Sequence, residues 1–189
     1  AGLRNGFDKM LSQIVSGSFV SDWSIAGYFN APSFSTLEVA MTPAEINPRA
    51  EQYSAGKGGE PITWVAYNAD SEGYVDLEAF NRDASPDNAI TTARVWFVSD
   101  GSEIAYTFGA DDTSRVMLNS EIIYEDFTDH SANPLQQVGT MKPKAGVNLL
   151  TISVENGSGG YGFYLRLFDD EVVESITTTP PETLSERSR

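Results

Sequence analysis

Two adjacent carboxylates, Asp111 and Asp112, are the residues of this sequence whose type and spacing best suggest a site. They interrupt an apolar pattern, so we expect them in a turn between two strands. Neighbouring carboxylates repel each other by about 1 kcal/mol when exposed and by more when desolvated, so a cation or hydrogen-bond donors often balance them. Calcium, which takes about six to eight oxygen ligands, is the cation we expect here. The alternative is that both acids are structural, and accept turn amides or pair with Arg115.

Aromatic side chains offer a second kind of site, because a planar ring can stack on the apolar face of a sugar while polar neighbours bond its hydroxyl groups. Tyr161 and Tyr164 lie beside the glycine-rich loop 156–160, and Trp96 lies in a strongly apolar stretch. These three residues are candidates for binding a glycan. Core packing is the alternative for Tyr161 and for Trp96, whose strand has apolar residues on both faces.

Catalytic chemistry has little support in the sequence. The single histidine, His130, lies in a polar loop without the G-x-S-x-G motif of a serine hydrolase, and we expect it to be an exposed loop residue. The 27 Asp and Glu residues form so many pairs that none stands out as the carboxylate pair of a glycosidase. Gly56–Gly59 lack the spacing of a phosphate-binding loop and predict a flexible loop. We therefore expect a protein that is not an enzyme.

The elements that would position these residues are short strands. Over residues 90–167, apolar and polar side chains alternate with period two, and turn clusters separate the alternating stretches. In the first of these strands, Val95 and Phe97 point to one face and Trp96 points to the other. The pattern predicts an all-β fold, a jelly-roll-like antiparallel β-sandwich, over residues 18–170.

The two ends of the chain depart from this pattern. Apolar residues recur at helical spacing in Leu3–Val15 and predict a short amphipathic helix within residues 1–17. This helix would pack on the sandwich or, alternatively, dock onto a neighbouring subunit. Residues 171–189 contain a Thr/Pro run and a polar end, so we expect a tail or a linker to another module. Residues 30–50 hold three prolines and predict an irregular crossing loop.

The composition limits the partners and the location. The chain of 189 residues carries a formal net charge of −15, and this excess of carboxylates repels phosphate backbones and anionic lipid surfaces. We therefore expect no nucleic-acid partner, and no apolar run is long enough to span a membrane. The lack of cysteine excludes disulfides and thiolate sites. The acidic, Gly/Ser/Thr-rich composition and an alanine in place of an initial methionine favour a secreted or cell-surface protein of a bacterium or archaeon.

Two longer runs carry a resemblance to known families. FGADDTSRVMLNSEII (Phe108–Ile123) and MKPKAGVNLLTISVEN (Met141–Asn156) resemble the core of two related β-sandwich families. One is the protective-antigen-like sugar-binding module, and the other is the galactose-binding-like domain attached to many glycoside hydrolases. WSIAGYF (Trp23–Phe29) is similar to the opening strand of such modules, whereas Ser120 stands where these families usually have glycine. The resemblance covers less than half of the chain and implies a β-sandwich of secreted or surface bacterial proteins.

The resemblance also implies a ligand. In modules of the first kind an Asp-Asp turn holds Ca²⁺, which in turn binds vicinal hydroxyl groups of a sugar. It therefore implies calcium at Asp111 and Asp112, with Asn119 as a neighbouring ligand-binding residue, and we include Arg115 among the ligand-binding candidates.

We expect a non-catalytic carbohydrate-binding-like accessory module whose partner is a polysaccharide or another glycan. One alternative is a structural or adhesive surface subunit that assembles with copies of itself or with a neighbouring module. A carbohydrate-active enzyme is the less supported alternative.

Overall fold

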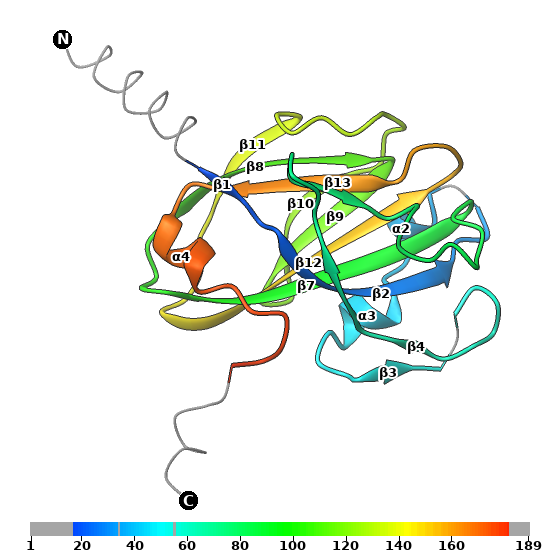
Figure 1. The fold of residues 1–189 in the computed structure, drawn as a ribbon, viewed down its shortest axis with the longest axis horizontal. Helices are drawn as coiled ribbons and strands as arrows, with labels where there is room; N and C mark the ends of the chain where they lie inside the picture. The colour runs from blue at the N-terminus through cyan, green and yellow to red at the C-terminus, as the bar shows by residue number, and fades with distance from the viewer. Residues whose placement is uncertain (1–16, 34, 55, 182–189) are drawn as a thin grey trace, which may run out of the picture.

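The computed structural model describes residues 17–33, 35–54 and 56–181, which form an antiparallel β-sandwich (Figure 1). The predicted all-β sandwich is thus confirmed. The five-stranded sheet has the order β1, β13, β8, β11, with β6 also paired to β13: β1 (Ser18–Phe19), β13 (Gly162–Leu167), β8 (Ile104–Asp111), β11 (Gln137–Met141) and β6 (Tyr74–Asp76). The six-stranded sheet has the order β10 (Glu121–Asp126), β9 (Thr113–Leu118), β12 (Gly146–Asn156), β7 (Ala89–Ser99), β2 (Asp22–Asn30) and β5 (Val65–Asn68).

Short elements complete the fold. β3 (Gln52–Tyr53) and β4 (Ile62–Thr63) form a small separate pair, and the helices are α2 (Thr36–Val39), α3 (Pro43–Ile46) and α4 (Asp170–Glu174). The helix expected over Leu3–Val15 lies outside the described residues. No helix in the described part of the chain is long and apolar enough to cross a membrane.

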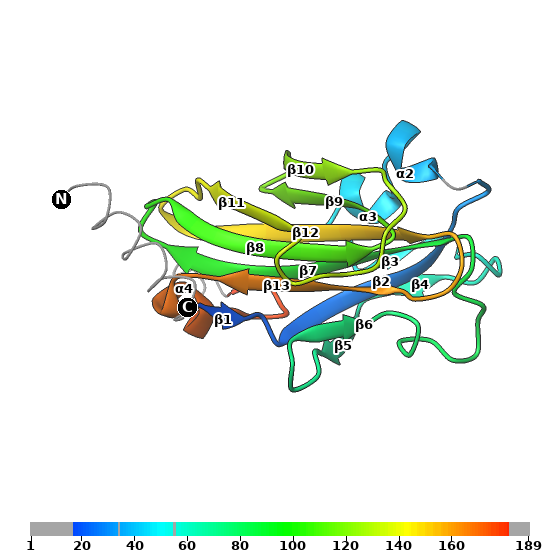
Figure 2. The same ribbon diagram turned by 90° about the horizontal axis from the view of Figure 1, so that it is seen from above.

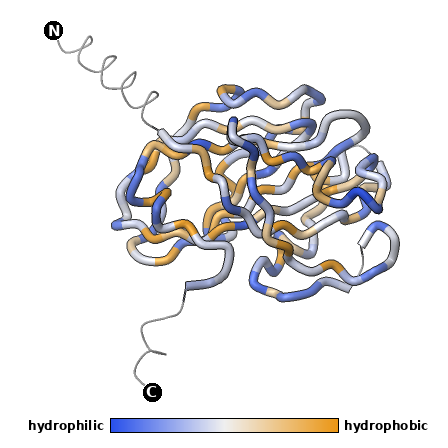
Figure 3. Tube along the Cα trace, viewed as in Figure 1, coloured by the Kyte–Doolittle hydropathy of each residue, from blue (hydrophilic) through white to orange (hydrophobic). Residues whose placement is uncertain are grey.

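Alternation along the strands builds the core between the two sheets. Val95 and Phe97 of β7 point into it and are almost fully buried, as the sequence pattern predicts. Phe163 of β13 meets Trp23 of β2 across the core, with ring centroids 4.9 Å apart in an edge-to-face arrangement. Hydrophobic residues run along the strands, and hydrophilic residues gather in the connecting loops (Figure 3).

Much of the outer face of the six-stranded sheet is buried as well, because the chain between β2 and β5 crosses it. The segment expected to be an irregular loop contains α2 and α3, and Thr42 caps α3 through a reciprocal capping box with Glu45. The Thr42 hydroxyl also lies 3.0 Å from that of Thr92 in β7. A second apolar cluster forms under this segment: Ala26, Phe29, Ala31, Leu37, Ala44, Tyr53, Ile62 and Ile90.

The chain after β13 also packs on this sheet. The backbones of Thr177 and Trp96 exchange two hydrogen bonds, of 2.9 and 2.8 Å, at a stretch of β7 that β2 does not reach. Two residues earlier, the Ser175 hydroxyl accepts a hydrogen bond from the Val98 amide. The expectation of a tail over residues 171–189 therefore needs correction: its first part forms most of α4 and an added strand-like contact, and residues 182–189 lie outside the described residues.

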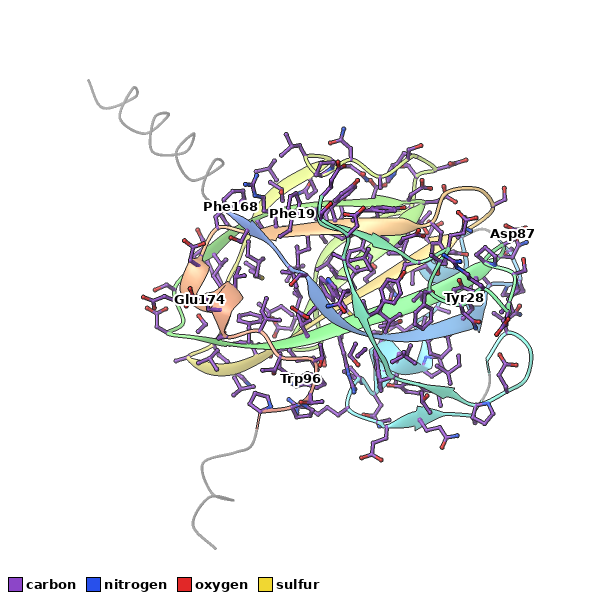
Figure 4. All side chains as sticks on the ribbon, viewed as in Figure 1. Phe19, Tyr28, Asp87, Trp96, Phe168 and Glu174 are labelled. Carbon is purple, nitrogen blue, oxygen red and sulfur yellow. The ribbon has the colours of Figure 1, made fainter. Side chains whose placement is uncertain are left out.

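The strand register gathers several loops at one end of the sandwich (Figure 2). The chain between β6 and β7, the turn between β8 and β9, and the loop between β12 and β13 all lie there, because Asn156 pairs with Ala89 and Gly162 with Asp111. β1 and α4 lie at the opposite end (Figure 1). In Figure 4, Asp87 marks the loop-bearing end and Glu174 marks the other.

Candidate functional site

The Asp111–Asp112 pair lies at the loop-bearing end, in the turn that links the two sheets. β8 ends at Asp111 and β9 begins at Thr113, as the expected turn between strands requires. Asp112 is 5% exposed, and its Oδ2 accepts a hydrogen bond of 3.0 Å from the Gly157 amide. Its own amide donates to the Glu155 carbonyl over 3.3 Å. The turn is thus fixed to the end of β12.

The electrostatic setting of Asp112 is unfavourable for a carboxylate. Burial raises its pKa to about 6, and the nearby charges of Asp111 and Asp129 raise the pKa as well. The hydrogen bond from Gly157 lowers the pKa, but by less. Within the described residues, neither Asp111 nor Asp112 forms an ion pair. The site therefore has negative charge that no cationic side chain of the described chain balances.

Asn156 brings a further oxygen to this end of the fold. Its side chain is fully buried, and its Nδ2 donates to the Pro86 carbonyl over 3.1 Å. Its Oδ1 has no hydrogen-bond partner. The residues on both sides of Asn156 contact Asp112, one through its carbonyl and the other through its amide. A buried amide oxygen without a donor is costly, and this one lies in the strand end that holds the carboxylate.

These oxygens fit the preferences of calcium. Among the described residues, no group of three or more histidine or acidic side chains could hold a metal ion, so carboxylates alone do not form a site. Calcium, however, also accepts amide and backbone carbonyl oxygens and water. Asp111, Asp112, Asn156 and the backbone of the loop 157–160 are the groups that could hold it. In that loop, Gly159 has a φ of 94°, a conformation that favours glycine.

Asp111 and Asp76 extend the acidic surface across the five-stranded sheet. Gly162 of β13 pairs with Asp111 of β8 on one side and with Asp76 of β6 on the other, which places both acids on the outer face of the sheet. The ring of Tyr74 lies over Gly162 between them. Burial raises the pKa of Tyr74, and the charges of the two acids raise it further.

Tyr164 is the predicted stacking residue that the structure leaves partly accessible. It is half-buried on the outer face of the five-stranded sheet, and its ring centroid lies 4.9 Å from that of Tyr74, at an interplanar angle of 44°. Phe19 of β1 also contacts it, with ring centroids 6.1 Å apart. The three rings are tilted relative to one another, so they do not form one flat platform.

Trp96 and Tyr161 are not available to a ligand, which corrects the expectation that they bind a glycan. Trp96 is 0% exposed, because the Thr177 segment and the Arg94 side chain cover it. Tyr161 is 1% exposed, and its hydroxyl lies 2.6 Å from the Thr91 hydroxyl. Both residues belong to the interior, which was the alternative that the sequence left open.

Arg115 and Asn119 also lie away from the Asp pair. Arg115 is 4% exposed on the outer face of the six-stranded sheet, where it forms ion pairs with Glu45 at 3.2 Å and Glu125 at 2.5 Å. Asn119 lies in the β9–β10 turn, and its Nδ2 donates to Asn148 Oδ1 over 2.8 Å. Placing these two residues beside the Asp pair was wrong, because β9 carries the chain along the sheet away from the turn.

His130 is half-buried, not exposed as the sequence suggests, and it holds a loop near the Asp pair. Its Nδ1 lies 3.1 Å from the Ala110 carbonyl, and its Nε2 lies 3.0 Å from Oδ2 of Asp126. Burial lowers its pKa, but the hydrogen bonds to these acceptors outweigh burial and the net pKa is raised. The two contacts of His130 fix the loop that contains Asp129 to the end of β8.

Two hollows lie on either side of the turn 81–86 at the same end of the molecule. The first hollow has a volume of about 510 Å³ and is lined by Lys57, Gly58, Glu60, Asn81, Asp83, Ala84 and Ser85. The second hollow has a volume of about 490 Å³ and is lined by Asp76, Glu78, Ala79, Arg82, Ala84 and Pro86. Asp76 also belongs to the acidic surface around Asp111, and the Pro86 carbonyl is bound by Asn156.

Sequence reasoning did not identify Asn156, Asp129 or Asp76 as site residues. Strand pairing between distant parts of the chain brings Asn156 to the turn at Asp112 and places Asp76 across β13 from Asp111. The charge of Asp129 acts on Asp112 from another loop. For Asn156 a local signal exists, since a polar residue that ends a strand directly before a glycine-rich loop is well placed to hold a ligand.

No protein-family model matches the chain, and no curated protein sequence matches it. In structure, the chain is similar to parts of a GH31 alpha-xylosidase from Xanthomonas citri (12% identity, TM-score 0.38), a beta-glucosidase from Kluyveromyces marxianus (18%, 0.43) and a GH2 beta-galacturonidase from Eisenbergiella tayi (12%, 0.44). The matches cover 57%, 76% and 79% of this chain but span 12%, 15% and 24% of those chains. Likenesses at this level do not support a functional assignment, so the function rests on the site itself.

Proposed function

We propose that this chain is a non-catalytic carbohydrate-binding module that binds a glycan, with the help of calcium, at the loop-bearing end of the sandwich. The observation that carries the proposal is the buried, unpartnered Oδ1 of Asn156, one residue from the amide that binds the buried Asp112 carboxylate. A buried amide oxygen without a donor and a buried carboxylate with a single donor are both costly, and a hard cation would satisfy both groups.

The surroundings support a sugar as the ligand. Calcium bound by Asp111, Asp112 and Asn156 would balance the acidic charge and offer coordination positions to sugar hydroxyl groups. Polar side chains line the two hollows beside it and can bond further hydroxyls. Tyr164 and Tyr74 offer partly exposed ring surface on the adjoining sheet. The acidic, Gly/Ser/Thr-rich composition supports a secreted or cell-surface location for such a module.

The experiment is a thermal-unfolding scan in EDTA and in millimolar CaCl₂. A ligand that binds only the folded state at about 100 times its Kd adds about 2.7 kcal/mol to the free energy of unfolding, which is a shift of several degrees. We expect this shift in the wild type and its loss in the Asp111→Asn/Asp112→Asn double variant. The matched control is Asp100→Asn/Glu103→Gln, which removes two acids at the opposite end of the sandwich.

Glycan binding is then measured on an array with and without calcium. The proposal predicts binding that depends on calcium and is lost in the Asp111→Asn/Asp112→Asn variant. A calcium shift of equal size in both double variants, or no shift at all, would contradict a site at the Asp pair.

A self-assembling surface subunit is the second candidate, and one strand favours it. β11 lies at the edge of the five-stranded sheet and contains no charged residue, and Val138 within it is 61% exposed. Uncharged edge strands are open to pairing with another chain. Size-exclusion chromatography with light scattering tests this: an oligomer that Val138→Lys dissociates supports self-assembly, and a monomer at all concentrations contradicts it.

A further inference from the structure

The turn 81–86, which separates the two hollows, is tied firmly to its surroundings. The Lys57 ammonium donates to the carbonyls of Ser85, at 3.1 Å, and Asp87. The Asn88 amide donates to the Gly157 carbonyl over 3.0 Å, and Asn156 binds the Pro86 carbonyl. The same Asn156–Gly157 backbone holds Asp112. The hollows are therefore fixed in position relative to the proposed calcium site.

The size of the hollows suits more than one sugar unit. Each has a volume of about 500 Å³, within the range of about 300–1,000 Å³ typical of small-molecule sites. They share Ala84 as a lining residue, so they adjoin along the crest of the turn. Asp76, which lines the second hollow, is one strand away from Asp111 on the same face of the sheet. We call the two adjoining hollows the path; its end at Asp76 is the one nearer to Asp111.

The charge of the path selects among glycans. Four carboxylates line it, from Glu60, Asp76, Glu78 and Asp83. The two cations that line it are Lys57, whose ammonium already binds two backbone carbonyls, and Arg82. Carboxylates accept hydrogen bonds from sugar hydroxyls and repel anionic groups, and the net charge of −15 adds to the repulsion.

We propose that the two hollows bind successive units of a neutral oligosaccharide, whose chain extends from the calcium site across the turn 81–86, and that they exclude acidic glycans such as uronic-acid polymers. This inference rests on the proposed glycan-binding function and adds the length and charge of the ligand to it.

The test measures Kd by calorimetry in CaCl₂ for neutral gluco-, manno- and xylo-oligosaccharides of increasing length, and for oligogalacturonides of matched length. For the neutral series that binds, we expect affinity to rise about tenfold from the monosaccharide to the trisaccharide, since contacts in the hollows add to those at the calcium site. Acidic oligomers are expected to bind more weakly than neutral oligomers of the same length, and most weakly at low salt.

Ala84→Trp places a large ring where the two hollows meet, and Ser102→Trp is the control on an exposed loop at the other end of the sandwich. In Ala84→Trp, affinity should no longer rise with the length of the oligosaccharide. The affinity for the monosaccharide and the calcium-induced shift in unfolding temperature should stay as in the wild type. If Ala84→Trp does not fold, Glu78→Gln/Asp83→Asn replaces it; both side chains are exposed, and the loss of two charges should reduce the discrimination against acidic oligomers.

The outcomes separate the two proposals. Calcium-dependent binding that is equal for all chain lengths, or that is unchanged in Ala84→Trp, overturns the oligosaccharide path and leaves the proposed function standing. Acidic oligomers that bind as well as neutral ones overturn the charge selection. The absence of any glycan binding, with or without calcium, overturns both.

Discussion

The Gly157 amide donates a 3.0 Å hydrogen bond to Oδ2 of Asp112, and this is the one hydrogen bond that the described residues give to that carboxylate. The contact joins the turn between β8 and β9 to the loop between β12 and β13. A buried carboxylate ordinarily needs several donors or a cation, so a single amide leaves Asp112 undercompensated. Burial therefore raises the pKa of Asp112 to about 6, because the single hydrogen bond from Gly157 lowers it by less and the nearby Asp111 and Asp129 raise it further.

We predict that Asp112 makes the stability of the protein fall with rising pH when calcium is removed. The pKa of Asp112 is about 6 in the folded chain against 3.8 for an ordinary aspartate, so between these values the folded state holds a proton that the unfolded state releases. The free energy of unfolding therefore decreases as pH rises through this window. Asp112→Asn stays neutral and should be more stable than the wild type near pH 7 in EDTA, with no such advantage near pH 4.

Chemical denaturation at the two pH values measures this difference. Calcium should reverse the order near pH 7, because the cation stabilises the ionised wild-type site and not the amide. Glu103→Gln, at the opposite end of the sandwich, should follow the wild type at both pH values. An Asp112→Asn variant that is less stable than the wild type in EDTA near pH 7 would show that the carboxylate is compensated by the protein alone.

The faces of the strands were predictable from the sequence, whereas what covers them was not. Alternation places Val95 and Phe97 on one face of β7 and Trp96 on the other, as the structure shows. Trp96 is nevertheless buried, because Thr177 and the chain between β2 and β5 cover the outer face of its sheet. The burial of this face depends on segments that are distant in sequence, so the local pattern of apolar residues does not predict it.

The site was predictable only in part, because only its local features can be recognised in the sequence. The turn at Asp111–Asp112 is a local feature, since two acids interrupt an apolar pattern. Asn119 is seven residues after Asp112 along β9, which at about 3.3 Å per residue places it about 23 Å away. Asn156 lies far along the chain, yet the pairing of β12 with β9 brings it to the turn. Residues a few positions apart along one strand, such as Asp112 and Asn119, are thus far apart in space. The residue that lies beside Asp112 comes instead from a neighbouring strand of the sheet.

A second prediction concerns the buried ion pair between Arg115 and Glu45. Their side chains are 5% and 1% exposed, and Arg115 also donates to the Leu37 carbonyl over 2.7 Å. Removal of one partner leaves a buried charge uncompensated, so Arg115→Met should lower the free energy of unfolding by about 3–5 kcal/mol. Urea denaturation at neutral pH measures the loss.

The exposed pair between Lys142 and Glu103 is the matched control. Its charged groups are 3.7 Å apart and its side chains are 82% and 48% exposed. Lys142→Met should change the free energy of unfolding by less than about 1 kcal/mol. Comparable losses in the two variants would mean that Arg115 contributes as an ordinary surface cation.

A third prediction separates Tyr161 from Tyr164. The Tyr161 hydroxyl lies 2.6 Å from the Thr91 hydroxyl and 3.0 Å from the Val154 carbonyl inside the core. Tyr161→Phe removes these hydrogen bonds and should cost about 1–2 kcal/mol of stability without changing glycan affinity. Tyr164→Phe, on the partly accessible face, should cost less than about 0.5 kcal/mol. A change in glycan affinity in Tyr161→Phe, measured well below its unfolding midpoint, would contradict its assignment to the core.

The last prediction tests the packed segment after α4. The Trp96 amide donates to the Thr177 carbonyl over 2.9 Å, and the Thr177 amide donates back over 2.8 Å. A chain that ends at Glu174 loses both bonds and uncovers the Trp96 ring. Two lost hydrogen bonds at about 1 kcal/mol each, together with the exposed apolar surface, should lower the free energy of unfolding by roughly 2–4 kcal/mol.

A chain that ends at Pro181 is the control, because it keeps the whole contact with Trp96. Hydrogen exchange followed by NMR gives the local measurement: in the shorter chain, the Trp96 and Val98 amides should exchange faster than in the control, while amides of β12 should change only in proportion to global stability. If the two truncations unfold at the same denaturant concentration and protect the Trp96 amide equally, the segment contributes no stability and acts as a tail. If they differ as expected, residues 175–177 extend the six-stranded sheet along the part of β7 that β2 leaves open.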